Sequence, residues 1–172
     1  MGVQLLFCVE TNKSANTDWV YINKTIKQYY IQSPEISLKP IPMGGKTNYR
    51  SKTVVAKINS YIRGYSRNGE TTVFYCIDTD NCESDPDRKK EFDSIRNYCK
   101  KQGYEFIWFC RDIEDVYWGE RVESGEKVKM AAKFNRYDQL QKLAEKDLSS
   151  NLIRKGKSNI LAVLDNYLER KK

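Results

Sequence analysis

Three apolar segments of the sequence run directly into acidic residues. The segment FCVE ends at Glu10, and FYCIDTD ends at Asp78 and Asp80. The segment FIWFC is followed by RDIED, which contains Glu114 and Asp115. In a parallel α/β sheet, functional residues gather at the carboxyl ends of the strands. If each apolar segment is such a strand, these acids meet at one edge of the sheet.

Such a group of acids predicts a divalent metal site. In an extended strand Asp78 and Asp80 point to the same side, so their like charges lie close together unless a cation neutralises them. Carboxylate oxygens without His or Cys ligands select Mg²⁺ or Mn²⁺. These ions activate water and hold phosphate oxygens for in-line displacement. The alternative interpretation is that the two aspartates only cap the turn after their strand.

No histidine occurs among the 172 residues. Self-contained Ser-His-Asp and Cys-His hydrolases, HExxH proteases, His-metal endonucleases and zinc deaminases with a His ligand are therefore excluded. Catalysis would have to depend on carboxylates, Lys, Tyr, Cys or a bound metal.

The five cysteines form no CxxC motif, and their odd number argues against a closed disulfide framework. This cysteine usage favours a reducing, cytoplasmic location.

The net charge of +7 is unevenly distributed. Residues 1–80 carry 10 basic and 6 acidic side chains, residues 81–123 carry 8 and 11, and residues 124–172 carry 12 and 6. An acidic middle between basic flanks suits a polyanion such as nucleic acid, although solvated helix faces would give the same pattern. The loop GGKTNYR lacks the spacing of a Walker phosphate loop. Its Lys46 and Arg50 are candidates for contacts with the backbone of a nucleic acid.

The spacing of apolar residues predicts strands alternating with helices. We expect strands over 4–9, 36–43 near a sheet edge, 71–78 at the sheet centre, and 104–110. We expect helices over 19–31 with Thr17 or Asp18 as cap, over 52–65, over 87–102 between Pro86 and Gly103, and beginning within 111–120. A basic helical segment over 130–148 and an amphipathic helix over 158–168 complete the chain.

This alternation predicts an α/β fold with a mostly parallel sheet and helices on both faces. No linker or repeat divides the chain, so residues 1–172 are expected to form one domain, with a core over about 3–120 and a basic helical C-terminal extension over about 124–172. No run approaches the 18 apolar residues of a membrane span, and the N-terminal segment lacks the basic start of a signal peptide.

The strand-end acids give the sequence a resemblance to the Toprim family, the metal-binding α/β domain of topoisomerases, bacterial primases and OLD nucleases. FCVE and FYCIDTDN match the family's Glu and Asp-x-Asp positions. The sequence is most similar to the small RloB-like and AbiL-type branch of bacterial defence loci and mobile elements. In that branch a helix begins with Thr-acid-x-x-Tyr, which is matched here by Thr17, Asp18 and Tyr21. A later Glu precedes an aromatic residue, which is matched here by Glu114 and Trp118.

The resemblance implies a single Toprim-like, Rossmannoid domain that acts as a Mg²⁺- or Mn²⁺-dependent nuclease in phage defence. Glu10 would be a metal ligand and general base. Asp78 and Asp80 would bind the same ion or a paired one, and Glu114 with Asp115 would complete a second metal position. A basic residue near the scissile phosphate would be Lys155 or Lys157. A separately encoded ATPase partner is implied as well, and self-association stays open.

One departure from the family and three alternative functions accompany this resemblance. The family usually places Gly after its first Glu, whereas Thr11 and Asn12 stand here, so we expect a different turn. A non-catalytic Toprim-like module that binds nucleic acid or regulates a partner is the main alternative. A glycosyltransferase that binds a nucleotide sugar through Asp-x-Asp would need a longer chain, and a haloacid-dehalogenase-like phosphatase would need its DxDx[TV] motif after the first strand.

Overall fold

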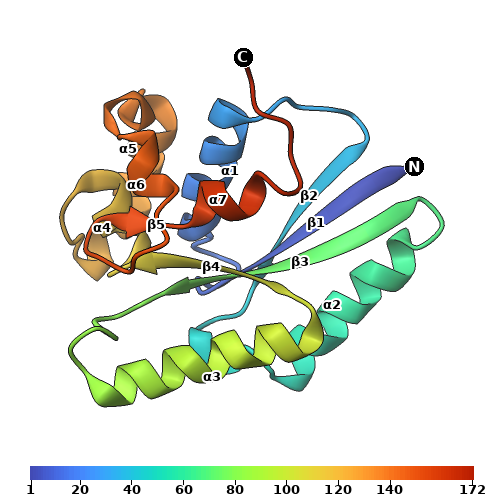
Figure 1. Cartoon of the computed structure of the whole chain (residues 1–172), viewed down its shortest axis with the longest axis horizontal. Helices are drawn as coiled ribbons and strands as arrows, with labels where there is room; N and C mark the ends of the chain where they lie inside the picture. The colour runs from blue at the N-terminus through green and yellow to red at the C-terminus, as the bar shows by residue number, and fades with distance from the viewer.

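A five-stranded sheet lies between two layers of helices in the computed structural model, which describes residues 1–172 (Figure 1). The strands are β1 (Gly2–Val9), β2 (Ile36–Pro42), β3 (Gly69–Asp78), β4 (Glu105–Cys110) and β5 (Lys157–Ser158). Their order is β2-β1-β3-β4-β5. The first four are parallel, and β5 pairs antiparallel with β4. The predicted α/β class with a mostly parallel sheet is therefore confirmed, and the fold is Rossmann-like.

Helices cover both faces of this sheet. The helices are α1 (Thr17–Tyr29), α2 (Lys52–Tyr65), α3 (Pro86–Gln102), α4 (Ile113–Trp118), α5 (Lys127–Arg136), α6 (Glu145–Leu148) and α7 (Ile160–Leu164), with 3₁₀ turns η1 (Lys46–Asn48), η2 (Ser124–Glu126) and η3 (Gln139–Lys142). Helices α2 and α3 lie on one face, and the remaining helices lie on the other (Figure 1). None of the helices is both long and apolar enough to cross a membrane.

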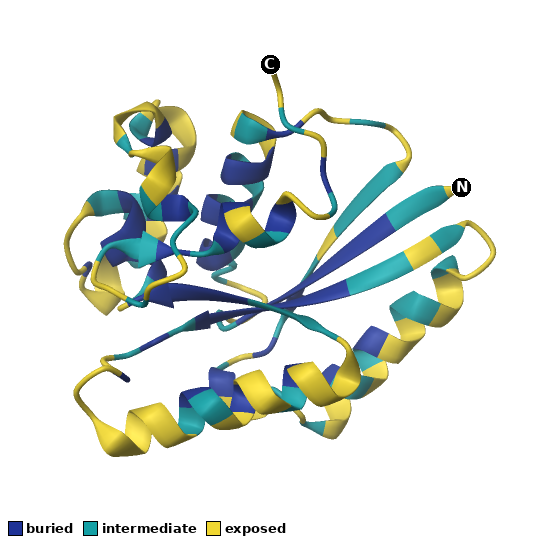
Figure 2. Ribbon diagram, in the orientation of Figure 1, coloured by how far each residue is buried: buried dark blue, intermediate teal, exposed yellow.

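The central strands are buried on both faces (Figure 2). In β1, Phe7 and Val9 pack under α1 and α7, whereas Leu6 and Cys8 pack against α2 and α3. This two-sided burial explains why the strand is a continuous apolar run without polar alternation. The sheet therefore provides a rigid platform whose carboxyl edge carries the acidic residues.

Several predicted elements are confirmed. Helix α2 spans 52–65 as expected, β3 is central, and β2 lies at the sheet edge. Helix α3 starts at Pro86, with Asp85 as its N-cap accepting hydrogen bonds from two backbone amides, and ends at Gly103 with a φ of 71°. Proline in the first turn and glycine in a left-handed C-cap are the expected start and stop signals of a helix.

The start of α1 and the helical segment over 130–148 were predicted wrongly. Thr17 and Asp18 lie inside α1, and Asn16 in a left-handed conformation precedes the helix. The basic segment is broken into α5, η3 and α6. Lys24 of α1 donates hydrogen bonds to the carbonyl groups of Phe134, Asn135 and Tyr137, which provides a cation at the C-terminus of α5 where the helix ends.

The C-terminal segment is also more integrated than the expected extension over 124–172. Residues 157–158 form β5 instead of beginning a helix, and α7 spans only 160–164. Ile160, Leu161 and Leu164 are fully buried in the core on the α1 face of the sheet. Ser158, the first residue of the predicted helix, pairs with β4 instead, so this segment completes both the sheet and the core.

Candidate functional site

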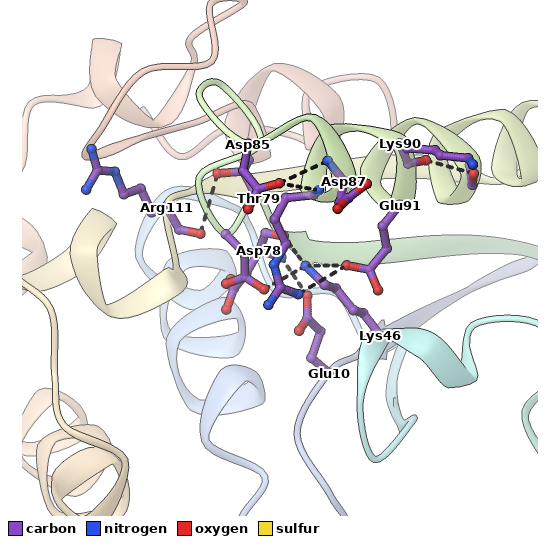
Figure 3. Close-up of polar contacts among 12 residues, drawn as sticks. Glu10, Lys46, Asp78, Thr79, Asp85, Asp87, Lys90, Glu91 and Arg111 are labelled. Atoms are coloured by element: carbon purple, nitrogen blue, oxygen red, sulfur yellow. Dashed lines mark hydrogen bonds and ion pairs between the residues drawn. The ribbon is translucent and has the colours of Figure 1, made fainter.

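Glu10 and Asp78 lie together at the carboxyl edge of the sheet. The parallel register pairs Val9 of β1 with Cys76 of β3, so the residues that end the two strands are neighbours. The backbone amide of Asp78 donates a hydrogen bond of 2.7 Å to Oε1 of Glu10 (Figure 3). The structure thus brings together two of the acids that the sequence singled out.

Two further buried acids lie near this pair. Asp18 of α1 is 8% exposed and accepts a hydrogen bond of 3.2 Å from the amide of Thr11, while Glu114 of α4 is fully buried. Burial raises the pKa of Asp78 well above its usual value, and the charges of Glu10, Asp18 and Glu114 raise it further. We refer to Glu10, Asp18, Asp78 and Glu114 as the acid centre.

Burial and mutual repulsion keep the acid centre from ionising fully near neutral pH. Burial raises the pKa of Glu10 to about 8, although the charge of Lys46 and the Asp78 amide oppose the shift. Burial, followed by the charge of Glu114, raises the pKa of Asp18 to about 6. Such shifts are typical of carboxylates that lack a neutralising cation, and they mark candidate functional sites.

Asp80 does not lie beside Asp78 as an extended strand would place it. Strand β3 ends at Asp78, and Asp80 adopts a left-handed backbone conformation with a φ of 46°. Its carboxylate accepts a hydrogen bond of 2.6 Å from Nζ of Lys46. The expectation that both aspartates lie in one extended strand was therefore wrong, because the strand ends at Asp78 and the turn begins between them.

Lys46, a candidate for nucleic-acid contacts, is buried and paired with acids. Its side chain is 7% exposed, and Nζ lies 2.6 Å from Asp80 and 3.3 Å from Glu91 of α3 (Figure 3). The loop is fixed because the amide of Gly45, at a φ of 120°, donates a 2.7 Å hydrogen bond to the carbonyl of Glu10. Arg50 stays exposed and lies over the ring of Tyr49.

Helix α4 presents its two acids differently. Oε2 of Glu114 accepts a hydrogen bond of 2.9 Å from Nζ of Lys127, while Oε1 has no partner. Asp115 is 4% exposed, and its Oδ1 is also without a partner. Both side chains carry a buried carboxylate oxygen that is free to accept a proton or bind a cation.

A polar pocket of about 430 Å³ lies beside the acid centre. Its lining contains no apolar residue and consists of Asp80, Asn81, Asp85, Arg88, Arg111, Asp112, Asp115, Arg121 and Lys155. Lys155 therefore lines this pocket. Lys157 does not line it, because the amine of Lys157 is paired with Asp147 of α6.

The turn after Glu10 is built without glycine. Asn12 accepts hydrogen bonds through its side chain from Ser14 Oγ and the amide of Ala15. Neither Thr11 nor Asn12 has a positive φ, and the left-handed residue of this connection is Asn16. An Asx-type turn thus makes the reversal after Glu10 without a glycine.

Several site residues were missed by the sequence analysis. Asp18 carried a signal, since it precedes Ile22 and Ile26 at helical spacing and so belongs to the inward face of α1. No pattern in the sequence pointed to Glu91 or Lys127, because each reaches the site only through the packing of α3 or α5. The arginines of the pocket come from three separate segments and could not be grouped before the fold was known. These missed residues are Asp18, Arg88, Glu91, Arg111, Arg121 and Lys127.

The donor atoms at this edge of the sheet fit a hard divalent cation. All candidate ligands are carboxylates, and two of their buried oxygens have no partner. No three Asp, Glu or Cys side chains are arranged as a ready-made ligand set around one point. Mg²⁺ is usually held by one or two carboxylates together with water and substrate phosphates, so a site centred on Glu10 and Asp78 suits its coordination.

Comparisons with known proteins assign no family to the chain. No family model matches the sequence. No curated protein matches it either. Among solved structures, a de novo designed Rossmann fold protein is similar at 12% sequence identity, with a TM-score of 0.30 over 80% of this chain and 100% of the designed one.

The raised pKa values predict that stability falls with rising pH when no divalent cation is present. The folded chain keeps a proton on Glu10 up to about pH 8, whereas the usual value is 4.5, so the folded state binds more protons between these limits. In EDTA, the melting temperature should be lower at pH 8.5 than at pH 6, and Mg²⁺ should raise it more at the higher pH. Glu10→Gln should flatten this dependence. A melting temperature that rises over this range would contradict the prediction.

Proposed function

We propose that this protein is a Mg²⁺-dependent nuclease that hydrolyses phosphodiester bonds in nucleic acid through a Toprim-like arrangement of acids. One observation carries the proposal: Glu10 and Asp78 are in contact at the ends of two adjacent parallel strands, within a buried acid centre. Acids that are costly to ionise together gain most from a divalent cation. The polar pocket beside them carries four basic and four acidic side chains, and the basic ones are available to contact an anionic substrate.

In this proposal Glu10 and Asp78 hold the ion. When bound, Mg²⁺ lowers the pKa of a water molecule and stabilises charge on phosphate oxygens. The Asp78 amide fixes the carboxylate of Glu10 in one orientation, which places it to accept a proton from the attacking water. Lys155 and Arg121 would bind the phosphate groups of the substrate.

The substrate class follows from charge, and its setting follows from the family resemblance. Exposed Arg111, Arg121 and Lys155 line the pocket, and guanidinium and ammonium groups bind phosphates of DNA and RNA alike. All five cysteines are free and buried, which agrees with a reducing cytoplasm. A role in phage defence and an ATPase partner are proposed on the resemblance alone.

A second candidate function is a non-catalytic module that binds nucleic acid. It is favoured by the ion pairs of Lys46 with Asp80 and of Lys127 with Glu114, which compensate part of the acid centre without any metal. Such a module would use the same basic pocket for phosphate contacts. It would not require a divalent cation for binding.

A cleavage assay distinguishes the two functions. The purified chain is incubated with labelled single- and double-stranded DNA and RNA in Mg²⁺, Mn²⁺ or EDTA. The nuclease proposal predicts cleavage of at least one substrate in Mg²⁺ or Mn²⁺, none in EDTA, and loss of cleavage in Glu10→Gln. Tight binding of all substrates with no cleavage would instead support the binding module, and cleavage that persists in EDTA would overturn the metal-dependent mechanism.

A further inference from the structure

Two lysine side chains enter the acidic edge of the sheet from opposite sides. Lys46 comes from the loop after β2 and contacts Asp80 and Glu91, at 2.6 and 3.3 Å. Lys127 comes from the start of α5 and contacts Glu114 at 2.9 Å. The outer acids therefore already have a positive partner. Lys46 pairs with Asp80 and Glu91, and Lys127 pairs with Glu114.

The acids between these lysines form no ion pair, although the charge of Lys46 acts on Glu10 from a distance. Glu10 and Asp78 form no ion pair, and Asp18 is held only by hydrogen bonding to backbone. All the charges that act most strongly on Asp78 are negative, those of Glu10, Asp18, Glu114 and Asp112. A divalent cation would gain most electrostatic energy at the centre, near Glu10 and Asp78, and least at Asp80.

Lys46 is held in place by both its side chain and its backbone. Besides its two carboxylate contacts, Nζ lies 3.5 Å from the carbonyl oxygen of Asp78, so three oxygens surround the amine. The loop behind it is tied to β1 by hydrogen bonds from Met43 to Val9 and from Gly45 to Glu10. A compact ammonium surrounded by oxygens at the end of β3 occupies the kind of position that a metal ion would take.

We propose that Lys46 is a resident counter-ion that fills one of two cation positions and holds Asp80 away from the metal. The site then takes a single divalent cation, bound by Glu10 and Asp78. This inference rests on the proposed metal-dependent function and defines Asp80 as a positioning residue instead of a metal ligand. It also explains why the turn at Asp80 is left-handed, since that conformation directs the carboxylate toward Lys46.

The number of bound ions tests this inference. The full-length chain is titrated with Mn²⁺ without nucleic acid, and free Mn²⁺ is followed by electron paramagnetic resonance. We expect one ion per chain for wild type and for Lys46→Arg, and a second ion for Lys46→Met and Lys46→Gln. Lys89→Met is the matched control, because Lys89 forms an exposed ion pair with Asp93 on α3 and should leave one ion. Circular dichroism confirms that each variant is folded.

The two aspartates give an independent comparison. Asp80→Asn should leave the affinity for the single ion within about threefold of wild type, whereas Asp78→Asn should weaken it by about tenfold or more. Two ions in wild type, one ion of unchanged affinity in both neutral Lys46 variants, or loss of the ion in Asp80→Asn would overturn the inference. One ion in wild type without any nuclease activity would overturn the proposed function but not the role of Lys46. No Mn²⁺ binding by wild type and Lys46 variants would overturn both.

Discussion

Asp78→Asn is expected to lower Mg²⁺-dependent cleavage by at least about 10³-fold, because it removes a charged ligand at the point where the reacting phosphate would meet the ion. The fold should be kept. Asparagine has nearly the same shape, and the substitution removes a carboxylate whose ionisation is opposed by burial and by four neighbouring acids. Single-turnover cleavage of a labelled oligonucleotide at saturating protein measures the effect.

Asp93→Asn is the matched control for this substitution. Asp93 lies on α3 and pairs with Lys89 and Arg96 at the surface, away from the acid centre. Its replacement should leave the cleavage rate within about twofold of wild type, since exposed ion pairs contribute little. Equal cleavage by Asp78→Asn and Asp93→Asn would show that the acid centre takes no part in the reaction.

Lys127→Met is expected to lower the free energy of unfolding by about 3 kcal/mol at pH 8 in EDTA, at the lower end of the range for breaking a buried ion pair. Glu114 is fully buried, and its Oε1 already lacks a partner, so loss of the Lys127 amine leaves an uncompensated charge. Burial raises the pKa of Glu114, so this acid takes up a proton more readily as the pH falls. The loss of stability should therefore be smaller at pH 5. Urea denaturation at the two pH values measures both effects.

The double variant Lys127→Met with Glu114→Gln separates charge from packing. Because it removes both members of the pair, most of the lost stability should return at pH 8. Lys129→Met removes an exposed ion pair between Lys129 and Glu126, and it should have little effect on the free energy of unfolding. If the double variant were as unstable as Lys127→Met alone, the destabilisation would come from lost packing of the Lys127 side chain.

Much of the fold followed from local patterns in the sequence. Continuous apolar runs in β1, β3 and β4 predicted buried parallel strands, and Pro86 with Gly103 marked the limits of α3. The C-terminal segment was less predictable because its structure depends on distant partners. Lys24 of α1 binds the carbonyls at the end of α5, and β5 is a two-residue strand defined only by pairing with β4.

The site was predictable only in part, for the same physical reason. Parallel topology places the ends of β1 and β3 at the same edge of the sheet, as the strand assignments predicted. That the two strands are neighbours, which brings Glu10 into contact with Asp78, depends on the strand order and became known only from the structure. The direction of Asp80 depends on one backbone angle in the turn, and apolar patterning carries no information about it. The lysines that pair with the acids are 34 and 13 residues from their partners and come from other elements.

Because the chain contains no histidine, other side chains must fill the roles of a base and of a positively charged group. In the proposed mechanism, which has no imidazole, the site would rely on carboxylates, the buried Lys46, the partly buried Lys127 and the basic side chains of the pocket. Carboxylates raised in pKa can act as bases near neutral pH, and internal lysines can hold acids in fixed positions. Both roles require the burial that the parallel sheet and its two helix layers provide.

The most direct test is to locate the ion by anomalous diffraction from crystals of the protein soaked in Mn²⁺. A single peak between the carboxylates of Glu10 and Asp78, with Lys46 still bound to Asp80, is the predicted result. A peak at Asp80 with Lys46 displaced would contradict the role of Lys46. No peak at the acid centre of a fully soaked crystal would contradict the metal site itself.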